Sequence, residues 1–447
     1  MAHNHKPNRS IQRRLQRLLG GVLLILWAFV AQPVRATTPG VIIRNEATSS
    51  FGEEIRFELE ASSSGTIVDV AFLYAQGVSA TDLPAFTEAR PEWEPDGGHV
   101  KATFVRDTSI DYLPVGVTIR YKWVLTYQDG TTQEIQGPNI TYLDTRFNWQ
   151  EKSDRGITVR WYGGDEAWGD ALLDSAVNGL DRLEQRIGGS VDDPMTITIY
   201  KNTSDMRAAL PPNSAEWVGG QAQPALGLIV GAIAPGDDSE LGRLVPHELS
   251  HLVLHQATEN NYGGMPVWFD EGVAVANQDS PDAGFSRRVS DAARNGELIP
   301  LRALASNFPA DPEKALLSYA QSESVVRYIE KTYGIEAIAG LVAEFKRGET
   351  DDKAVENTLS ISLDTLDEEW RATLAAAERT PEPVAASDRA PASRFTEGPR
   401  QRVPAGSAAT DSISELPVWV WGAGGLGALL IVAGSVWIVR ESRIVRR

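Results

Sequence analysis

The chain has 447 residues, a formal net charge of −18, 42% hydrophobic residues and 23% charged residues. This balance is typical of folded proteins and argues against a disordered chain, and the length suggests two or three domains. An acidic surface repels nucleic acid, so we expect no nucleic-acid partner. The sequence contains no cysteine, which excludes disulfides, cysteine-ligated zinc and a thiol nucleophile.

The N-terminal residues 1–36 have the pattern of an export signal. Several basic residues precede an apolar run at residues 18–30, and Val34-Arg35-Ala36 resembles a small-x-small cleavage site. The apolar run is shorter than the ~20 residues that a membrane span needs. We therefore expect a signal peptide rather than an uncleaved anchor.

Residues 40–147 are dominated by short runs in which apolar and polar residues alternate. Examples are the runs at 55–59 and 119–125, and turn signals such as Asp96-Gly97-Gly98 separate them. Alternation with a period of two is the signature of strands with one buried face. We predict an all-β immunoglobulin-like sandwich with a spacer or adhesion role.

The segment from about residue 155 to 376 mixes the two periodicities and predicts an α+β domain. The predicted strands cover residues 157–162, 195–200 and 227–231, and the predicted helices cover 167–187, 315–332, 336–347 and 363–377. If strand 227–231 forms the edge of a sheet, an extended peptide could pair with it as a further strand.

The most informative motif is His247-Glu248-Leu249-Ser250-His251. Two histidines four residues apart on a helix lie roughly 5–6 Å apart on one face, so both imidazoles can reach one metal ion. Asp237, followed by Glu240, fits a capping box at the start of this helix. Pro246 either opens a new first turn or kinks the helix just before His247.

A third ligand follows in the run Trp268-Phe269-Asp270-Glu271-Gly272. Catalytic zinc needs three protein ligands and one open position, and His247, His251 and Glu271 supply that set. Asp270 is an alternative carboxylate ligand. A closed structural zinc site is disfavoured because such sites usually take four cysteine or histidine ligands.

Simpler interpretations of these residues remain beside the metal site. The two motif histidines could be partly buried surface residues, with Glu248 an ordinary helix glutamate. His255 lies on roughly the same face as His247, where it is either a packed, hydrogen-bonded histidine or a partner of a ligand.

The chain from about residue 155 to 376 resembles the peptidase MA-like group of gluzincin metallopeptidases, distant relatives of aminopeptidase N and thermolysin. Three segments carry the resemblance, in the family's order: HELSH, PVWFDEGVA and SYAQSESVVRYIEKTYG. The resemblance implies zinc as cofactor, a peptide or protein as substrate and His247, His251 and Glu271 as the metal ligands. It also implies Glu248 as general base and Tyr319 as a catalytic residue that donates a hydrogen bond to the oxyanion. Core packing is the competing role for Tyr319.

The sequence departs from these families in two places. No Gly-x-Met-Glu-Asn segment precedes the motif, and this is the element by which relatives of aminopeptidase N hold a free substrate amine. An endopeptidase is therefore expected rather than an aminopeptidase. The carboxylate Glu271 also comes one residue later than in those enzymes.

Composition changes sharply after the predicted domain. Residues 377–415 are rich in Pro, Ala and Ser and predict a disordered stalk. Residues 416–439 carry no charge and predict a transmembrane helix, and the arginine-rich residues 440–447 predict a cytoplasmic tail. This topology anchors the chain in the cell membrane by a single pass, with the catalytic domain extracytoplasmic.

Two classes of function follow. The first is a membrane-anchored, extracytoplasmic zinc metallopeptidase, an endopeptidase that hydrolyses peptide bonds with a zinc-activated water and Glu248 as base. The second is a catalytically inactive cell-surface binding or adhesion protein with a metallopeptidase-like domain. The sequence carries no indication of oligomeric state.

Overall fold

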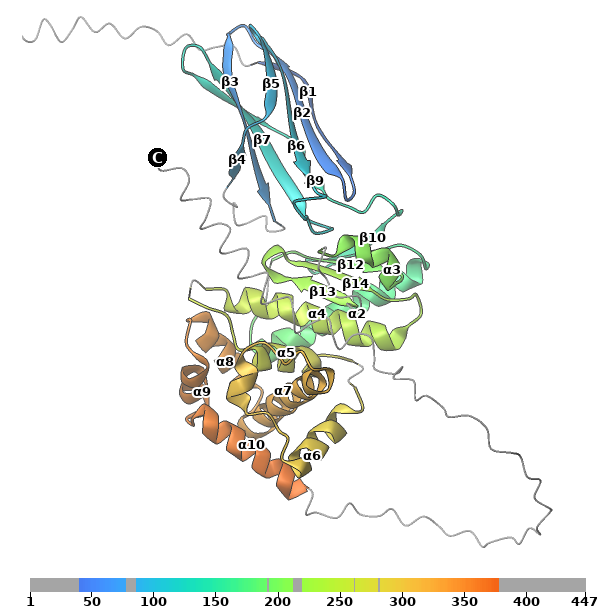
Figure 1. The fold of residues 1–447 in the computed structure, drawn as a ribbon, viewed down its shortest axis with the longest axis vertical. Coiled ribbons are helices and arrows are strands. Elements are labelled where there is room, and N and C mark those ends of the chain that lie inside the picture. The colour runs from blue at the N-terminus through green and yellow to red at the C-terminus, as the bar shows by residue number, and fades with distance from the viewer. Residues whose placement is uncertain are drawn as a thin grey trace, which may run out of the picture.

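The computed structural model describes residues 40–77, 86–190, 193–211, 219–260, 262–279 and 282–377. A β-rich N-terminal region lies at one end of the molecule and a mostly helical region at the other, with a mixed sheet between them (Figure 1). The β-rich region and the α+β region of the predicted fold class are both present.

Two sheets form the N-terminal region and pack face to face. One sheet has the order β1-β2-β6-β5, and the other has the order β4-β3-β7-β8 with β9 beside β7. Along β2, β3 and β7 the inward side chains are buried around a shared aromatic core that includes Phe57, Phe72 and Trp123. The alternation of the sequence therefore produced the predicted sandwich. The strands are β1 (Val41–Ser50), β2 (Glu54–Ser62), β3 (Ile67–Gln76), β4 (Thr87–Ala89), β5 (Glu92–Asp96), β6 (His99–Asp107), β7 (Thr118–Tyr127), β8 (Thr132–Gln136) and β9 (Ile140–Thr141).

The central sheet has the order β10-β11-β12-β14-β13. Strands β11, β12 and β14 are parallel, and β10 and β13 run antiparallel to their neighbours. Two long helices, α2 (Glu166–Ile187) and α4 (Asp238–Thr258), cover one face, where Ile197 and Ile229 join their core. The strands are β10 (Gln150–Asp154), β11 (Ile157–Trp161), β12 (Met195–Tyr200), β13 (Gly220–Gln223) and β14 (Leu228–Ala232).

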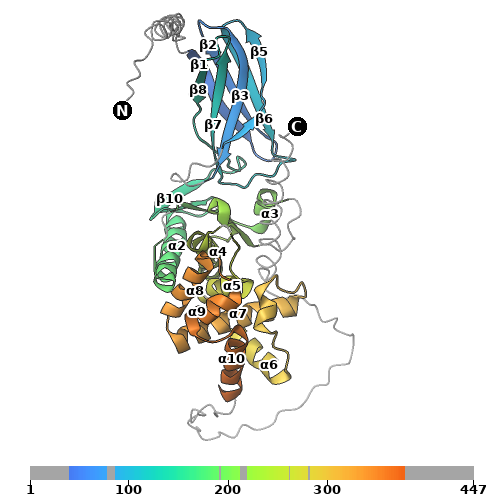
Figure 2. The ribbon, with the colours of Figure 1, turned by 90° about the vertical axis from the view of Figure 1, so that its left-hand side faces the viewer.

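The sandwich covers the opposite face of this sheet (Figure 2). Leu228 of β14 is buried in the core of the sandwich. Gly116, with a φ of +94°, lies against it, because a Cβ there would be 3.4 Å from Leu228 Cδ2. Below them, Tyr200 donates a 2.9 Å hydrogen bond to the fully buried Asp144, to which Arg146 also donates. The sandwich and the sheet therefore share a continuous interior.

The helical region follows the sheet in sequence. It contains α5 (Val267–Ala276), α6 (Phe285–Asn295), α7 (Pro312–Tyr333), α8 (Glu336–Lys346), α9 (Asp351–Leu359) and α10 (Leu363–Ala377). The four helices predicted from periodicity are present as α2, α7, α8 and α10. The central packing is between α5 and α7, which approach closely at Gly272.

The condition stated for strand 227–231, that it forms an edge of the sheet, is not met. Strand β14, predicted within residues 227–231 as a possible edge, lies between β12 and β13. The edge is β13, a strand of only four residues, Gly220–Gln223. The antiparallel pairing of β13 covers the side of β14 that the prediction left open.

The predicted fold class also needs a correction at its C-terminal end. Among the residues that the structure describes, no helix has the length and the apolar composition that crossing a membrane requires. The segment 416–439, predicted as a transmembrane helix on its hydropathy, lies outside the described residues, as do the signal at 1–36, the stalk beyond residue 377 and the tail.

Candidate active site

The two motif histidines lie on α4, the helix packed between the sheet and α5. Asp237 caps the helix as predicted, since its side chain accepts a 3.0 Å hydrogen bond from the backbone N–H of Glu240. The helix runs through Pro246 without a break in its assignment. The rings of His247 and His251 lie one turn apart with their centroids separated by 5.0 Å.

Helix α5 brings Glu271 to both histidines. Its Oε2 atom lies 3.5 Å from His247 Nε2 and 3.6 Å from His251 Nε2. Ligands held about 2.0–2.1 Å from one ion at the tetrahedral angle lie roughly 3.3 Å from each other, close to these separations. Glu271 Oε2 is also buried and accepts no hydrogen bond from any described residue. The donor atoms of His247, His251 and Glu271 all lie within 4.8 Å of one another, and this set fits a divalent metal ion.

Each of the two histidines has a side-chain partner at its Nδ1 atom. Asp270 Oδ1 lies 2.9 Å from His251 Nδ1, and Gln278 Nε2 lies 3.0 Å from His247 Nδ1. Asp270 therefore contacts the far side of a ligand rather than the point where the three donors meet. Partners of this kind fix which ring nitrogen faces the metal.

Burial and neighbouring charges separate the two histidines electrostatically. Burial, together with the charge of His251, lowers the pKa of His247 to about 3. Burial also acts to lower the pKa of His251, but the charges of Asp270 and Glu271 outweigh it and raise this pKa to about 10. Burial raises the pKa of Glu271. Burial thus favours the neutral form of His247, whereas the charges of Asp270 and Glu271 favour the protonated form of His251.

Glu248 lies on the side of α4 that faces the sheet edge. A Cβ built on Gly220 would lie 3.3 Å from Glu248 Oε1, so the carboxylate is beside the backbone of β13. Glu248 is only 7% exposed. Within the described part of the chain, β13 has no strand on its outer side. The Glu248 carboxylate therefore lies next to the strand that ends the sheet on this side, among the residues that the structure describes.

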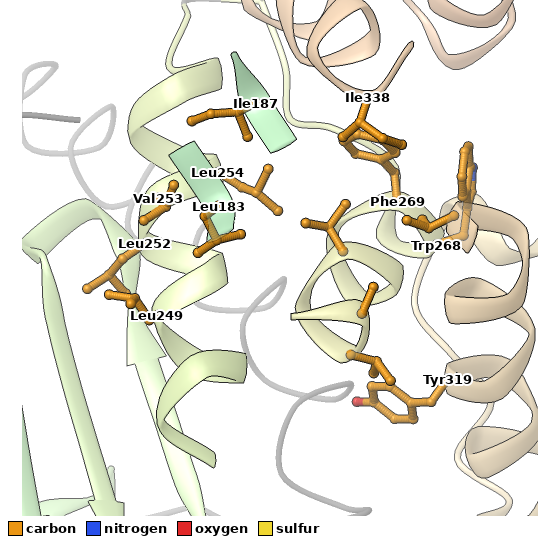
Figure 3. Packing of buried hydrophobic residues seen from close by; sticks show 14 of the residues in the cluster. Leu183, Ile187, Leu249, Leu252, Val253, Leu254, Trp268, Phe269, Tyr319 and Ile338 are labelled. Carbon is orange, nitrogen blue, oxygen red and sulfur yellow. The ribbon is translucent and has the colours of Figure 1, made fainter. Parts of the chain in front are cut away.

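Tyr319 comes from α7 and is 2% exposed. Its hydroxyl points away from α7 in Figure 3 and interacts with the Glu271 carboxylate, although no described residue meets the distance and angle of a regular hydrogen bond with it. Burial, followed by the charge of Glu271, raises the pKa of the phenol well above its usual value. Its ring packs edge-on against Phe308 at 5.1 Å. The ring of Tyr319 therefore packs in the hydrophobic core, and its protonated hydroxyl lies near the metal ligands.

The structure separates His255 from this group, since it is absent from the cluster of converging donors. Sequence reasoning missed Gly220, Asn277 and Gln278. Asn277 donates hydrogen bonds to Pro246 O at 3.1 Å and to Ser250 Oγ at 3.2 Å, which ties the end of α5 to the motif helix. The sequence signal that could have indicated Asn277 and Gln278 is that two adjacent amide side chains directly follow an apolar helix end.

The chain was compared with family models, curated proteins and solved structures. No curated protein matches the chain. A solved aminopeptidase N family protein from Idiomarina loihiensis is similar with a TM-score of 0.32 and 10% identity, over 73% of this chain and 59% of that one. This chain thus spans about 59% of that protein's length, and the similarity is too low to define the fold. The family model of the Peptidase MA superfamily matches residues 175–376, the region that contains all the converging side chains. The chain therefore carries a peptidase MA-like domain, with a donor set able to hold a metal ion.

Proposed function

We propose that the protein is a zinc-dependent endopeptidase. The observation that carries the proposal is the convergence of His247, His251 and Glu271 next to Glu248, which itself lies beside the open edge strand β13. Two imidazoles and one carboxylate are a common ligand set of catalytic zinc, and three protein ligands leave a fourth position for a reactant. When bound, zinc polarises the scissile carbonyl and lowers the pKa of water.

In this proposal, side chains of the protein transfer the proton, stabilise the oxyanion and orient the ligands. Glu248 takes a proton from the attacking water and later gives it to the leaving amine. Because its pKa is raised, Tyr319 stays protonated and donates a hydrogen bond to the developing oxyanion. Asp270 and Gln278 orient the two ligating rings.

The edge strand supports cleavage within a peptide rather than at its amino end. An extended substrate can pair with the outer side of β13, which gives main-chain recognition. The side chains of β13 are Gly220, Gln221, Ala222 and Gln223, none of them acidic. This strand therefore offers no carboxylate to hold a free substrate amine.

We also propose an extracytoplasmic location for the catalytic domain. The support is the export-signal pattern of residues 1–36, with basic residues followed by an apolar run. Cell fractionation with a cytoplasmic marker tests this location, and recovery of the whole protein with that marker would contradict it.

The test of activity uses metal analysis and a mixed peptide library. We expect one zinc per chain and cleavage that a chelator abolishes and added zinc restores. Peptides with acetylated amino ends should be cut as fast as free ones, because β13 has no amine-binding carboxylate. Faster cleavage of free amino ends would contradict the endopeptidase assignment. Bound zinc with no chelator-sensitive cleavage would instead indicate the inactive binding protein.

A further inference from the structure

The two histidines of the metal site have chemically different partners. His251 faces the carboxylate of Asp270, whereas His247 faces the amide of Gln278 at 3.0 Å. Gln278 is 6% exposed, and its Oε1 atom is buried and accepts no hydrogen bond from any described residue. The site thus contains a second orphaned acceptor besides Glu271 Oε2.

A histidine that ligates through Nε2 carries its proton on Nδ1, and that proton needs an acceptor. A half-turn of the Gln278 amide exchanges Oε1 and Nε2 without changing the shape of the side chain. Oε1 then accepts the Nδ1–H of His247, and Nε2 takes the buried position that Oε1 held. If Gln278 Nε2 faced Nδ1 instead, Nδ1 of His247 would have to be unprotonated. The proton of the His247 ring would then lie on Nε2, the atom that faces Glu271.

The position of Gln278 is rigidly defined. It follows Asn277, the residue at the end of α5 that is hydrogen bonded to Pro246 and Ser250 of the motif helix. Its backbone N–H also bonds Val275 O at 3.2 Å. One short segment, from Asp270 to Gln278, therefore contacts both histidines and supplies the carboxylate ligand.

We infer that Gln278 is a positioning residue of the metal centre: its Oε1 accepts the Nδ1–H of His247 and selects the tautomer that presents Nε2 to the ion. Because an amide is neutral, it fixes the ring without the charge that Asp270 adds to His251. The inference rests on the proposed zinc site and adds a specific partner for one ligand.

Zinc affinity of the full chain tests this inference, measured by competition with a chromogenic chelator. Loss of such a partner typically weakens metal binding by about 10–100-fold, which is the expected effect of Gln278→Leu. Gln278→Glu retains an acceptor and should bind zinc at least as tightly as the wild type. Gln256→Leu is a matched control on α4, since Gln256 Oε1 is also buried without a partner among the described residues, and no contact of this residue with the ligands is described. Its affinity should not change.

A spectroscopic measurement separates positioning from a general loss of structure. With ¹⁵N-labelled histidine, of which the chain has six, the zinc-bound wild type should show a slowly exchanging Nδ1–H of His247 that exchanges faster in Gln278→Leu. If the wild type binds no zinc, the proposed function and this inference both fail. If the wild type binds zinc and Gln278→Leu binds it equally, or Gln278→Glu loses as much affinity as Gln278→Leu, only the role of Gln278 is overturned.

Discussion

Gly272 directly follows the ligand Glu271 at the closest approach of α5 and α7. A Cβ at this position would lie 2.5 Å from the backbone oxygen of Ser322 and 2.7 Å from Val326 Cγ2. In Gly272→Ala the helices must separate by roughly 0.9 Å to reach ordinary contact, because a backbone atom cannot rotate away. Overpacking of this kind costs about 1–3 kcal/mol, partly offset by about 1 kcal/mol from the higher helix propensity of alanine.

The same displacement reaches the metal site. Metal–ligand distances tolerate only about ±0.2 Å, so moving α5 by several times that amount should weaken zinc binding by about tenfold or more. Chelator competition measures this loss, and urea unfolding of the metal-free chain measures a destabilisation of about 0–2 kcal/mol. Gly264→Ala is the control, since no described atom lies within 4 Å of a Cβ there and its φ is not in the positive range. Equal zinc affinity and equal unfolding in the wild type and Gly272→Ala would refute the reasoning.

Four further outcomes follow from the structure. Glu248→Gln should keep zinc but lose about 10²–10⁴-fold in peptide cleavage, as the proton acceptor is removed; unchanged turnover in a peptide assay would exclude Glu248 as base. Since the pKa of His251 is raised to about 10, zinc binding at pH 7–9 should release about one proton from this histidine. The zinc affinity should therefore increase about tenfold for each unit by which the pH rises, and calorimetry in buffers of different ionisation enthalpy can measure the released proton. Burial raises the pKa of Asp351 from 3.8 to about 6, so the free energy of unfolding falls as the pH rises through this range. In Asp351→Asn the amide oxygen can still accept the hydrogen bond from Trp268 Nε1. Removal of the buried charge, less the favourable effect of that charge at the helix N-terminus, should raise the free energy of unfolding by about 2 kcal/mol at pH 7 but not at pH 4, as urea unfolding measures. Leu228→Ala should cost about 2–5 kcal/mol and leave one cooperative unfolding transition for sandwich and sheet, whereas two transitions would mean that they fold separately.

The arrangement of the motif residues could be predicted because it depends on local patterns. His247 and His251 lie four residues apart on one helix, and that spacing by itself places the rings on one face. Glu271 was proposed from its residue type and because a catalytic zinc site needs a third protein ligand. The short edge strand at Gly220–Gln223 was missed because four residues with two amides show neither apolar alternation nor a β-branched run.

The missed residues are functional only through contacts that are distant in sequence. Gln278 meets His247 across 31 positions, and Gly220 meets Glu248 only because β13 pairs with β14 beside the motif helix. Composition and hydropathy contain no information about such pairings. The same limit applied to strand 227–231, whose apolar sequence fits an interior strand as well as an edge.

The shared interior of sandwich and sheet has a practical consequence for how the gene can be divided. The family match starts at residue 175, inside α2, and so omits β10, β11 and the first two turns of that helix. A recombinant fragment cut there would leave the strand face that carries Tyr200 and Val230 exposed to water and should aggregate. We therefore expect that the part of the chain that contains His247, His251 and Glu271 does not fold without the sandwich. Tags and insertions are better placed at the turn around Gly130, where no described atom lies within 4 Å of an added Cβ.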